Sequence, residues 1–184
     1  MVYPIIVYGS PILRQVAKDI EINDPGVQQL IDDMFETMYA SDGMGLAAPQ
    51  IGKSLRLFII DLSALEDEDP SLKDYKKVFI NTRILEYNEE TITMNEGCLS
   101  FPTIREDVER KNKIRIQYYD ENWVYHDEYF EGLTARVIQH EYDHTEGILF
   151  IDLIPQLRKK LLRRKLSDIS KLKVETSYKI KLLK

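Results

Sequence analysis

The sequence has a single cysteine and no long apolar run, and these two shortages exclude several classes of protein. Its only cysteine, Cys98, excludes an intramolecular disulfide bond and fits a reducing compartment. No segment approaches the roughly 18 consecutive apolar residues of a membrane-spanning helix, so we expect no membrane partner. Residues 1–6 also lack the charged start and the small-residue cleavage site of a signal peptide. We therefore expect a cytoplasmic protein.

Positive charge is in deficit as well. The chain carries 25 lysines and arginines against 31 aspartates and glutamates, and this net charge of -6 argues against general affinity for DNA or for anionic membranes. Basic residues nevertheless gather after Pro155, in 158–160 and 163–165. The solvated face of an amphipathic helix is the simplest explanation of that run. A docking surface for an acidic partner such as ribosomal RNA is the alternative.

Two segments have the apolar periodicity of helices. One runs from Val27 to Met38, and the other begins after Pro155. We expect the second helix to dock one side on the core through its apolar residues, which are Leu157, Leu161, Leu162, Leu166 and Ile169. The remaining residues, 171–184, are expected to form a peripheral tail, with either a short strand at 178–180 or partial disorder.

Several segments between these helices are rich in β-branched and aromatic residues, which favour strands. They are 55–61, 78–81, 84–87, 114–119 and 123–126. Residues 120–122 supply a hairpin turn between the last two, which indicates antiparallel sheets. A chain of 184 residues is long enough for one well-buried core and short for two, so we expect a single domain spanning 1–184.

The segment His140-Glu141-Tyr142-Asp143-His144 indicates a metal site. Four residues turn a helix by about 400°, so His140 and His144 lie on one face and can bind one ion. Glu141 lies beside that ion, where it can take a proton from water that the metal activates. An amphipathic helix with solvated polar groups is the competing interpretation. The metal site is favoured because Leu133 and Val137 continue the face of the histidines as an apolar stripe, and buried histidines need partners.

These elements predict an α+β fold. Antiparallel β-sheets are expected to pack around a central metal-binding helix, with an N-terminal and a C-terminal helix outside them.

Two histidines leave a catalytic tetrahedral metal one protein ligand short, because such sites usually have three protein ligands. Cys98 can supply the third. A lone cysteine is more often a small buried apolar residue, and a nucleophile is a further possibility. Beside a two-histidine helix the ligand role is favoured, since a thiolate adds negative charge at the ion and is held deprotonated by it.

Residues 43–52 hold three glycines, two alanines and a proline. This composition is typical of a segment whose backbone is approached closely by another group. On glycine content alone a tight structural loop is the favoured explanation, because the segment has no phosphate-binding signature. Gln50 is the side chain in it that can donate a hydrogen bond to a substrate oxygen.

Segments 43–50, 96–100 and 139–144 resemble the three signature motifs of the peptide deformylase family, in the same order and at the same spacing. The resemblance extends from Pro11 through the helix after Pro155. It implies a cytoplasmic bacterial enzyme that hydrolyses the N-formyl group from the initiator formyl-methionine of nascent polypeptides and releases formate. Two alternatives remain: a zinc peptidase of the His-Glu-x-x-His kind, and a metal-binding protein without catalysis that docks on ribosomes through its basic C-terminal helix.

The resemblance also implies roles for individual residues. Cys98, His140 and His144 would bind one divalent metal ion, Fe²⁺ in vivo, with Zn²⁺, Ni²⁺ or Co²⁺ possible in purified protein. Glu141 would be the general base and acid, and Gln50 and the backbone N–H of Leu99 would stabilise the oxyanion. Substrate binding would involve Met44, Gly45, Met94, Glu96, Gly97, Arg105, Leu133 and Val137.

Two arginines leave alternatives open. Arg136 stands where the family commonly has an apolar residue, and it is expected either to reach the pocket rim or to face solvent. Arg105, on the strand after Pro102, matches a substrate contact, and a surface ion pair with Glu106 or Glu109 is the alternative.

Overall fold

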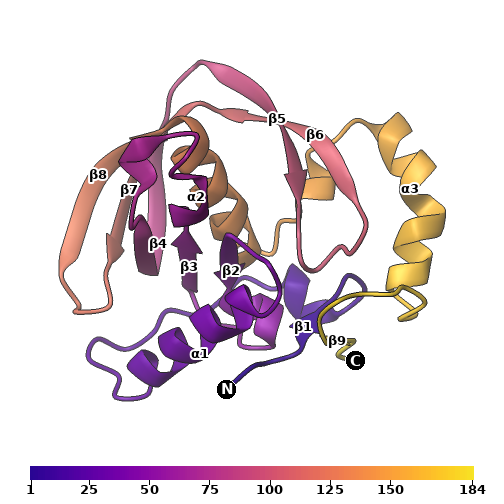
Figure 1. Cartoon of the computed structure of the whole chain (residues 1–184), viewed down its shortest axis with the longest axis horizontal. Helices are drawn as coiled ribbons and strands as arrows, with labels where there is room; N and C mark the ends of the chain where they lie inside the picture. Colours follow the sequence, from indigo (N-terminus) through magenta and orange to yellow (C-terminus); the bar gives the residue numbers. More distant parts are fainter.

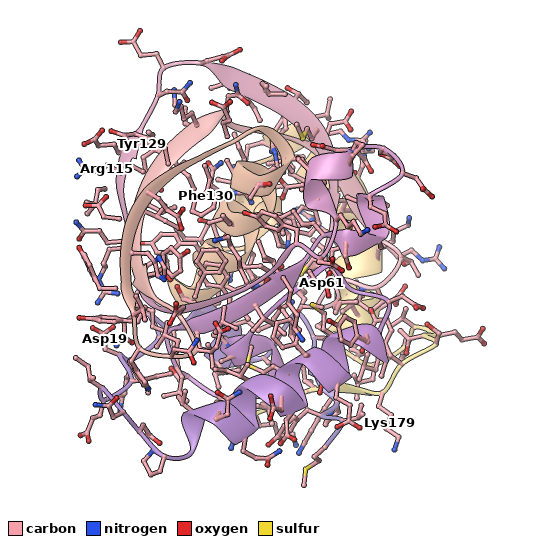
Figure 2. The ribbon with its side chains drawn as sticks, turned by 60° about the vertical axis from the view of Figure 1, so that its left-hand side comes forward. Asp19, Asp61, Arg115, Tyr129, Phe130 and Lys179 are labelled. Carbon is pink, nitrogen blue, oxygen red and sulfur yellow. The ribbon has the colours of Figure 1, made fainter.

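A five-stranded antiparallel sheet forms the middle of the computed structural model, which describes residues 1–184. Its strands follow the order β2 (Gly45–Ala47), β3 (Leu57–Asp61), β4 (Lys76–Tyr87), β7 (Lys113–Tyr119) and β8 (Tyr125–Glu131). Side chains alternate between its two faces because the period of a strand is two. Phe130 points inward, whereas Arg115 and Tyr129 lie on the outer face, as Figure 2 shows.

The sheet lies between two helices, so β3 is buried on both faces. Leu57 and Ile59 pack in the core cluster with α1 (Val27–Tyr39), and Phe58 and Ile60 pack in the cluster with α2 (Gly132–Thr145). The strand is therefore continuously apolar. The predicted N-terminal helix is confirmed, and α2 is the central helix expected from the motif (Figure 1).

The two strands predicted at 78–81 and 84–87 are a single strand, β4, with a bulge between them. Asn81 has a φ of 54°, and the register with β7 shifts between Ile80 and Arg83. Such a bulge bends a strand without ending it, which explains why the sequence pattern is interrupted there. The hairpin turn at 120–122 is confirmed, since Asp120 accepts hydrogen bonds from the N–H groups of Asn122 and Val124.

Strands β5 (Thr91–Gly97) and β6 (Arg105–Lys111) form a separate antiparallel hairpin that arches beside α2 (Figure 1). Val108 joins this hairpin to a third core cluster, which also contains Phe150 and two residues of α3 (Gln156–Ile169). The α+β class with antiparallel sheets is confirmed. No helix has both the length and the apolar composition needed to cross a membrane.

The prediction that five apolar residues of α3 dock on one side was wrong for two of them. Leu162 and Ile169 are buried, but Leu157 and Leu161 are 69% and 66% exposed. Each helical residue turns about 100°, so Leu157 and Leu161 form a stripe separate from that of Leu162 and Ile169. One packing partner covers only one of the two stripes.

The tail returns to the start of the chain and ends in an ordered strand. β9 (Ile180–Lys181) pairs in parallel with β1 (Ile5–Ile6), as Figure 1 shows. The N–H of Leu183 also donates to the hydroxyl of Ser10 at 3.0 Å. The strand predicted at 178–180 therefore exists, shifted by one to two residues, and the alternative of partial disorder is wrong.

Candidate metal centre

Three side chains from two separate segments converge at the buried end of α2. His140 and His144 project from one face of the helix, as the spacing predicts, and Cys98 follows directly after β5. The sulfur of Cys98 lies 3.2 Å from Nε2 of His144, and the ligand atoms of all three residues lie within 4.8 Å of one another. One thiolate and two imidazoles are a ligand set that suits zinc and ferrous iron. The structure therefore supports one metal bound by Cys98, His140 and His144.

Glu96 orients the first histidine. Its Oε2 accepts a hydrogen bond from Nδ1 of His140 at 2.8 Å, which leaves Nε2 as the lone-pair atom for a metal. Burial raises the pKa of Glu96, but hydrogen bonds from His140 and Arg110 outweigh burial and hold that pKa well below its usual range. The carboxylate therefore stays charged. Its side chain faces His140, so Glu96 can meet a substrate only through its backbone.

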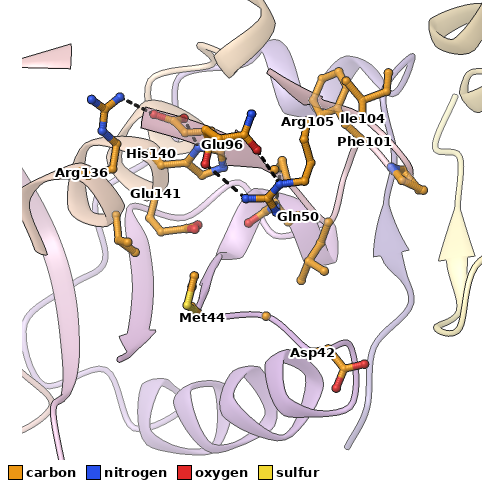
Figure 3. Close-up of a pocket in the computed structure, with 18 of the residues that line it drawn as sticks. Asp42, Met44, Gln50, Glu96, Phe101, Ile104, Arg105, Arg136, His140 and Glu141 are labelled. Carbon is orange, nitrogen blue, oxygen red and sulfur yellow. Dashed lines mark hydrogen bonds and ion pairs between the residues drawn. The ribbon is translucent and has the colours of Figure 1, made fainter. Parts of the chain in front are cut away.

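Arg136 lines the cavity and does not face solvent, so the second of its two expectations was wrong. The guanidinium is buried and donates to Glu96 Oε1 at 2.7 Å, to the Val108 carbonyl at 2.8 Å and to the Ile92 carbonyl. A buried arginine is tolerated here because a carboxylate and two carbonyls satisfy its donors. Arg136 thus ties α2 to both strands of the β5–β6 hairpin, which forms a pocket wall (Figure 3).

We expect Arg136→Met to lower the free energy of unfolding by about 3 kcal/mol, because it leaves a buried carboxylate with one cation fewer and removes two further hydrogen bonds to backbone carbonyls. Arg110 and His140 still bind Glu96, so the expected loss of unfolding free energy is at the low end of the range for a broken buried ion pair. Urea unfolding of the metal-loaded protein measures it, with Arg164→Met on the exposed face of α3 as control. Equal midpoints for the two variants would show that the buried contacts of Arg136 contribute little.

Glu141 lies against Gly45 with one oxygen free. A Cβ atom on Gly45 would stand 2.5 Å from Oε1 of Glu141, so the glycine leaves room for the carboxylate in this position. The other oxygen, Oε2, is buried and has no hydrogen-bond partner. Burial raises the pKa of Glu141 to about 7. A carboxylate with one unpaired buried oxygen beside a metal-ligand cluster is suited to receive a proton.

The amide of Gln50 is held in one orientation. Its Oε1 accepts the N–H of Ala47 at 2.8 Å, so Nε2 must face the cluster, where it lies 3.4 Å from the sulfur of Cys98 and 3.3 Å from the hydroxyl of Ser100. The glycine-rich segment is therefore more than a tight turn, because it places a donor next to the ligands.

Cys98 and His140 of the cluster line a cavity of about 430 Å³, and His144 lies behind them. All eight residues predicted to bind substrate line it, together with Gln50, Leu99 and Glu141 (Figure 3). The cavity wall also includes residues that the sequence patterns did not indicate, namely Asp42, Asn95, Phe101, Thr103, Ile104 and Tyr178. Most of these adjoin a motif in sequence, but Tyr178 comes from the tail, and no local pattern connects it with the site.

Arg105 also lines the cavity, and the alternative of a surface ion pair with Glu106 or Glu109 is wrong. Its Nε donates to the side chain of Asn95 at 2.8 Å, whereas Glu106 pairs with Arg158 of α3 at 2.8 Å. Gly97 stands opposite Arg105 in the hairpin, and a Cβ atom there would lie 2.7 Å from the guanidinium. The glycine therefore leaves space for the arginine at the pocket wall.

The chain is similar to known proteins over almost its whole length. The family model described as polypeptide deformylase matches residues 2–160. Peptide deformylase from Christiangramia forsetii is 48% identical, covering 98% of this chain and 96% of that protein, and the one from Cytophaga hutchinsonii is 48% identical, covering 98% and 97%. The crystal structure of peptide deformylase from Thermus thermophilus superposes with a TM-score of 0.82 at 40% identity, covering 94% of this chain and 99% of that one.

Proposed function

The chain belongs to the polypeptide deformylase family, a family of metal-dependent hydrolases, and we propose that Cys98, His140 and His144 hold the metal with which it deformylates formyl-methionyl peptides. The observation that carries this assignment is the convergence of the three ligands at a cavity whose wall also includes Glu141 and Gln50. We propose that residues 1–184 act as one catalytic domain in the cytoplasm, where nascent chains carry the formyl group.

Each step of the proposed reaction is assigned to a different group in the cavity. When bound, a divalent metal would supply Lewis acidity for activating water and the formyl carbonyl. Glu141 accepts the proton that the attacking water loses, and then returns it to the nitrogen of the departing amine. Gln50 Nε2 and the backbone N–H of Leu99 donate to the oxyanion of the tetrahedral intermediate. The products are formate and a peptide with a free amino group.

Substrate selection follows from the apolar part of the wall. Met44, Met94, Leu133 and Val137 form a lining for the unbranched methionine side chain, which flexible thioethers accommodate well. The backbone of Gly45 and Gly97 is open to a bound peptide, and Arg105 lies where the chain beyond methionine would pass.

A comparison of two peptides separates deformylation from general peptidase activity. Formyl-Met-Ala-Ser should yield formate and Met-Ala-Ser, and unformylated Met-Ala-Ser should remain intact. Cleavage of the Met–Ala bond at a comparable rate would favour the zinc-peptidase alternative. Metal bound without turnover of either peptide would favour the non-catalytic one.

We expect Gln50→Ala to lower turnover by roughly 100-fold while the metal stays bound, because removing one preorganised oxyanion donor has an effect of that order. Steady-state kinetics on formyl-Met-Ala-Ser, normalised to metal content, measures it. A rate within a factor of about two of the unaltered enzyme would exclude Gln50 as an oxyanion donor.

For the resident ion we propose Fe²⁺, with Zn²⁺, Ni²⁺ or Co²⁺ replacing it in purified protein. The donor set supports each of these ions, and intrinsic affinity favours zinc over ferrous iron, so handling decides the occupant. A thiolate on iron is open to oxidation. Protein purified without oxygen should contain iron and lose activity over hours in air. Stable activity in air at constant iron content would count against ferrous iron.

We also propose that α3 docks on the ribosome. The exposed stripe of Leu157 and Leu161 lies on the helix that carries the basic residues Lys160, Arg163 and Arg164, and this combination suits an acidic surface with apolar patches. Charge reversal of the three basic residues should abolish co-sedimentation with ribosomes and leave turnover of free formyl-Met-Ala-Ser unchanged. Equal co-sedimentation of both proteins would refute docking through α3.

A further inference from the structure

The C-terminal tail reaches the catalytic cavity through a single side chain. The hydroxyl of Tyr178 donates a hydrogen bond of 2.9 Å to the carbonyl oxygen of Leu99, which lies 79 positions away in the chain. Tyr178 is partly buried, packs against the core cluster of α1 and lines the cavity. Burial raises the pKa of Tyr178 to about 12, so its hydroxyl keeps its proton and remains a donor.

This bond completes the support of the segment that carries Cys98. The Cys98 carbonyl accepts the N–H of Phe101 at 2.9 Å, and the Ser100 carbonyl accepts the N–H of Tyr8 at 3.0 Å. The Leu99 carbonyl between them has no backbone donor, and Tyr178 is its partner. Without the hydroxyl, the Leu99 carbonyl has no hydrogen-bond donor, and the peptide group between Leu99 and Ser100 loses a contact that orients it.

The tail itself is well anchored, so it can act as a fixed support. Ile180 and Lys181 pair with Ile5 and Ile6, and Tyr8, which holds the Ser100 carbonyl, lies two residues after the end of that first strand. The hydroxyl of Thr176 donates to the carbonyl of Tyr178 at 2.6 Å. Both ends of the chain thus hold the segment, one through Tyr8 and the other through Tyr178.

We propose that Tyr178 is a positioning residue for the oxyanion site. Its hydroxyl holds the Leu99 carbonyl and so restrains rotation about the Leu99 Cα atom, which keeps the Leu99 N–H on the adjoining peptide group aimed at the reacting carbonyl. This inference rests on the proposed role of Leu99. An oxyanion donor stabilises the transition state only when it is held in place before the charge develops, so a mobile Leu99 would lower turnover without changing substrate binding.

The test is Tyr178→Phe, which keeps the ring and removes the hydroxyl. We expect kcat for formyl-Met-Ala-Ser to fall about 10-fold, with KM within a factor of about two and the metal content unchanged. The control is Tyr129→Phe, which removes a hydroxyl that donates to Glu86 on the surface, 3.1 Å away, and should change nothing. A second readout is the Leu99 amide resonance in Zn²⁺-loaded protein labelled with ¹⁵N-leucine, which should shift only in Tyr178→Phe.

Three outcomes overturn the proposal. Unchanged kcat in Tyr178→Phe overturns it, an unshifted Leu99 resonance overturns it, and a fall in activity that only follows a loss of metal shows general structural support instead. Gln50→Ala and Glu141→Gln, measured in parallel, separate this from a failure of the proposed function. If they keep full turnover the assigned chemistry is wrong, whereas if they lose it and Tyr178→Phe does not, only the role of Tyr178 is wrong.

Discussion

Glu141→Gln is expected to lower the turnover of formyl-methionyl peptides by on the order of 1,000-fold while the metal stays bound. Glutamine has the shape of glutamate, so it still fits against Gly45, but it cannot accept a proton. The effect is large because one carboxylate serves both proton transfers, first as base and then as acid. The unpaired buried oxygen of Glu141 is the atom that the substitution removes from this chemistry.

Steady-state kinetics with metal analysis on the same sample measures this effect. Glu109→Gln is the matched control, because Glu109 is exposed on β6 and should tolerate the same change without loss. Full deformylation by metal-loaded Glu141→Gln would show that another group transfers the proton. Glu141 would then only line the cavity.

His144→Ala is expected to weaken metal binding by at least about 100-fold and to reduce deformylation to background. Loss of a group that merely orients a ligand costs about 10- to 100-fold in affinity, and loss of a ligand itself costs no less. Two ligands, Cys98 and His140, would remain, one fewer than the usual number at catalytic sites of this kind.

The chain offers a matched control for this substitution. His126 is the only histidine outside the cluster, and it binds Asp120 at 2.8 Å on the β7–β8 hairpin. His126→Ala should keep both metal and activity after dialysis against a weak chelator. If His144→Ala also kept one metal per chain under these conditions, the three-ligand assignment would be wrong.

The metal cluster could be predicted from the sequence because each part of it is local. His140 and His144 are four residues apart, so the geometry of one helix places them together, and Gln50 belongs to a ten-residue segment of unusual composition. Cys98 required the assumption that a two-histidine site needs a third ligand. The structure brings the three ligand atoms within 4.8 Å of one another and places Gln50, Cys98 and His140 on the wall of one cavity.

Only a strand at Arg105 was predicted in this region, and its pairing with β5 was missed because the buried positions of the β5–β6 hairpin carry charge. In β6, Glu106 and Arg110 face inward, where a strand pattern normally has apolar residues. They are stable there because Arg158 pairs with Glu106, and Glu96 and Asp143 pair with Arg110. These partners lie far away in sequence, so no local pattern reveals them. Arg136 was misjudged for the same reason.

The tail was hard to predict for a related reason. Helical periodicity located α3, but it could not tell which of the two apolar stripes would be covered. Nothing near Tyr178 indicates that its partner is Leu99, because the contact depends on the pairing of the first and last strands.

The pairing of β1 with β9 also determines when a newly synthesised chain reaches full activity relative to when it can bind metal. Synthesis adds about 5–20 residues per second, so the ribosome reaches Lys181 roughly 4 to 17 s after Cys98. Within this interval, synthesis of His144 completes the set of metal ligands. Until the tail is made, however, β1 has no partner strand and the Leu99 carbonyl has no hydrogen-bond donor. A chain interrupted before Tyr178 would thus be expected to load metal and yet work slowly, and metal uptake and full activity should be separable in time during translation.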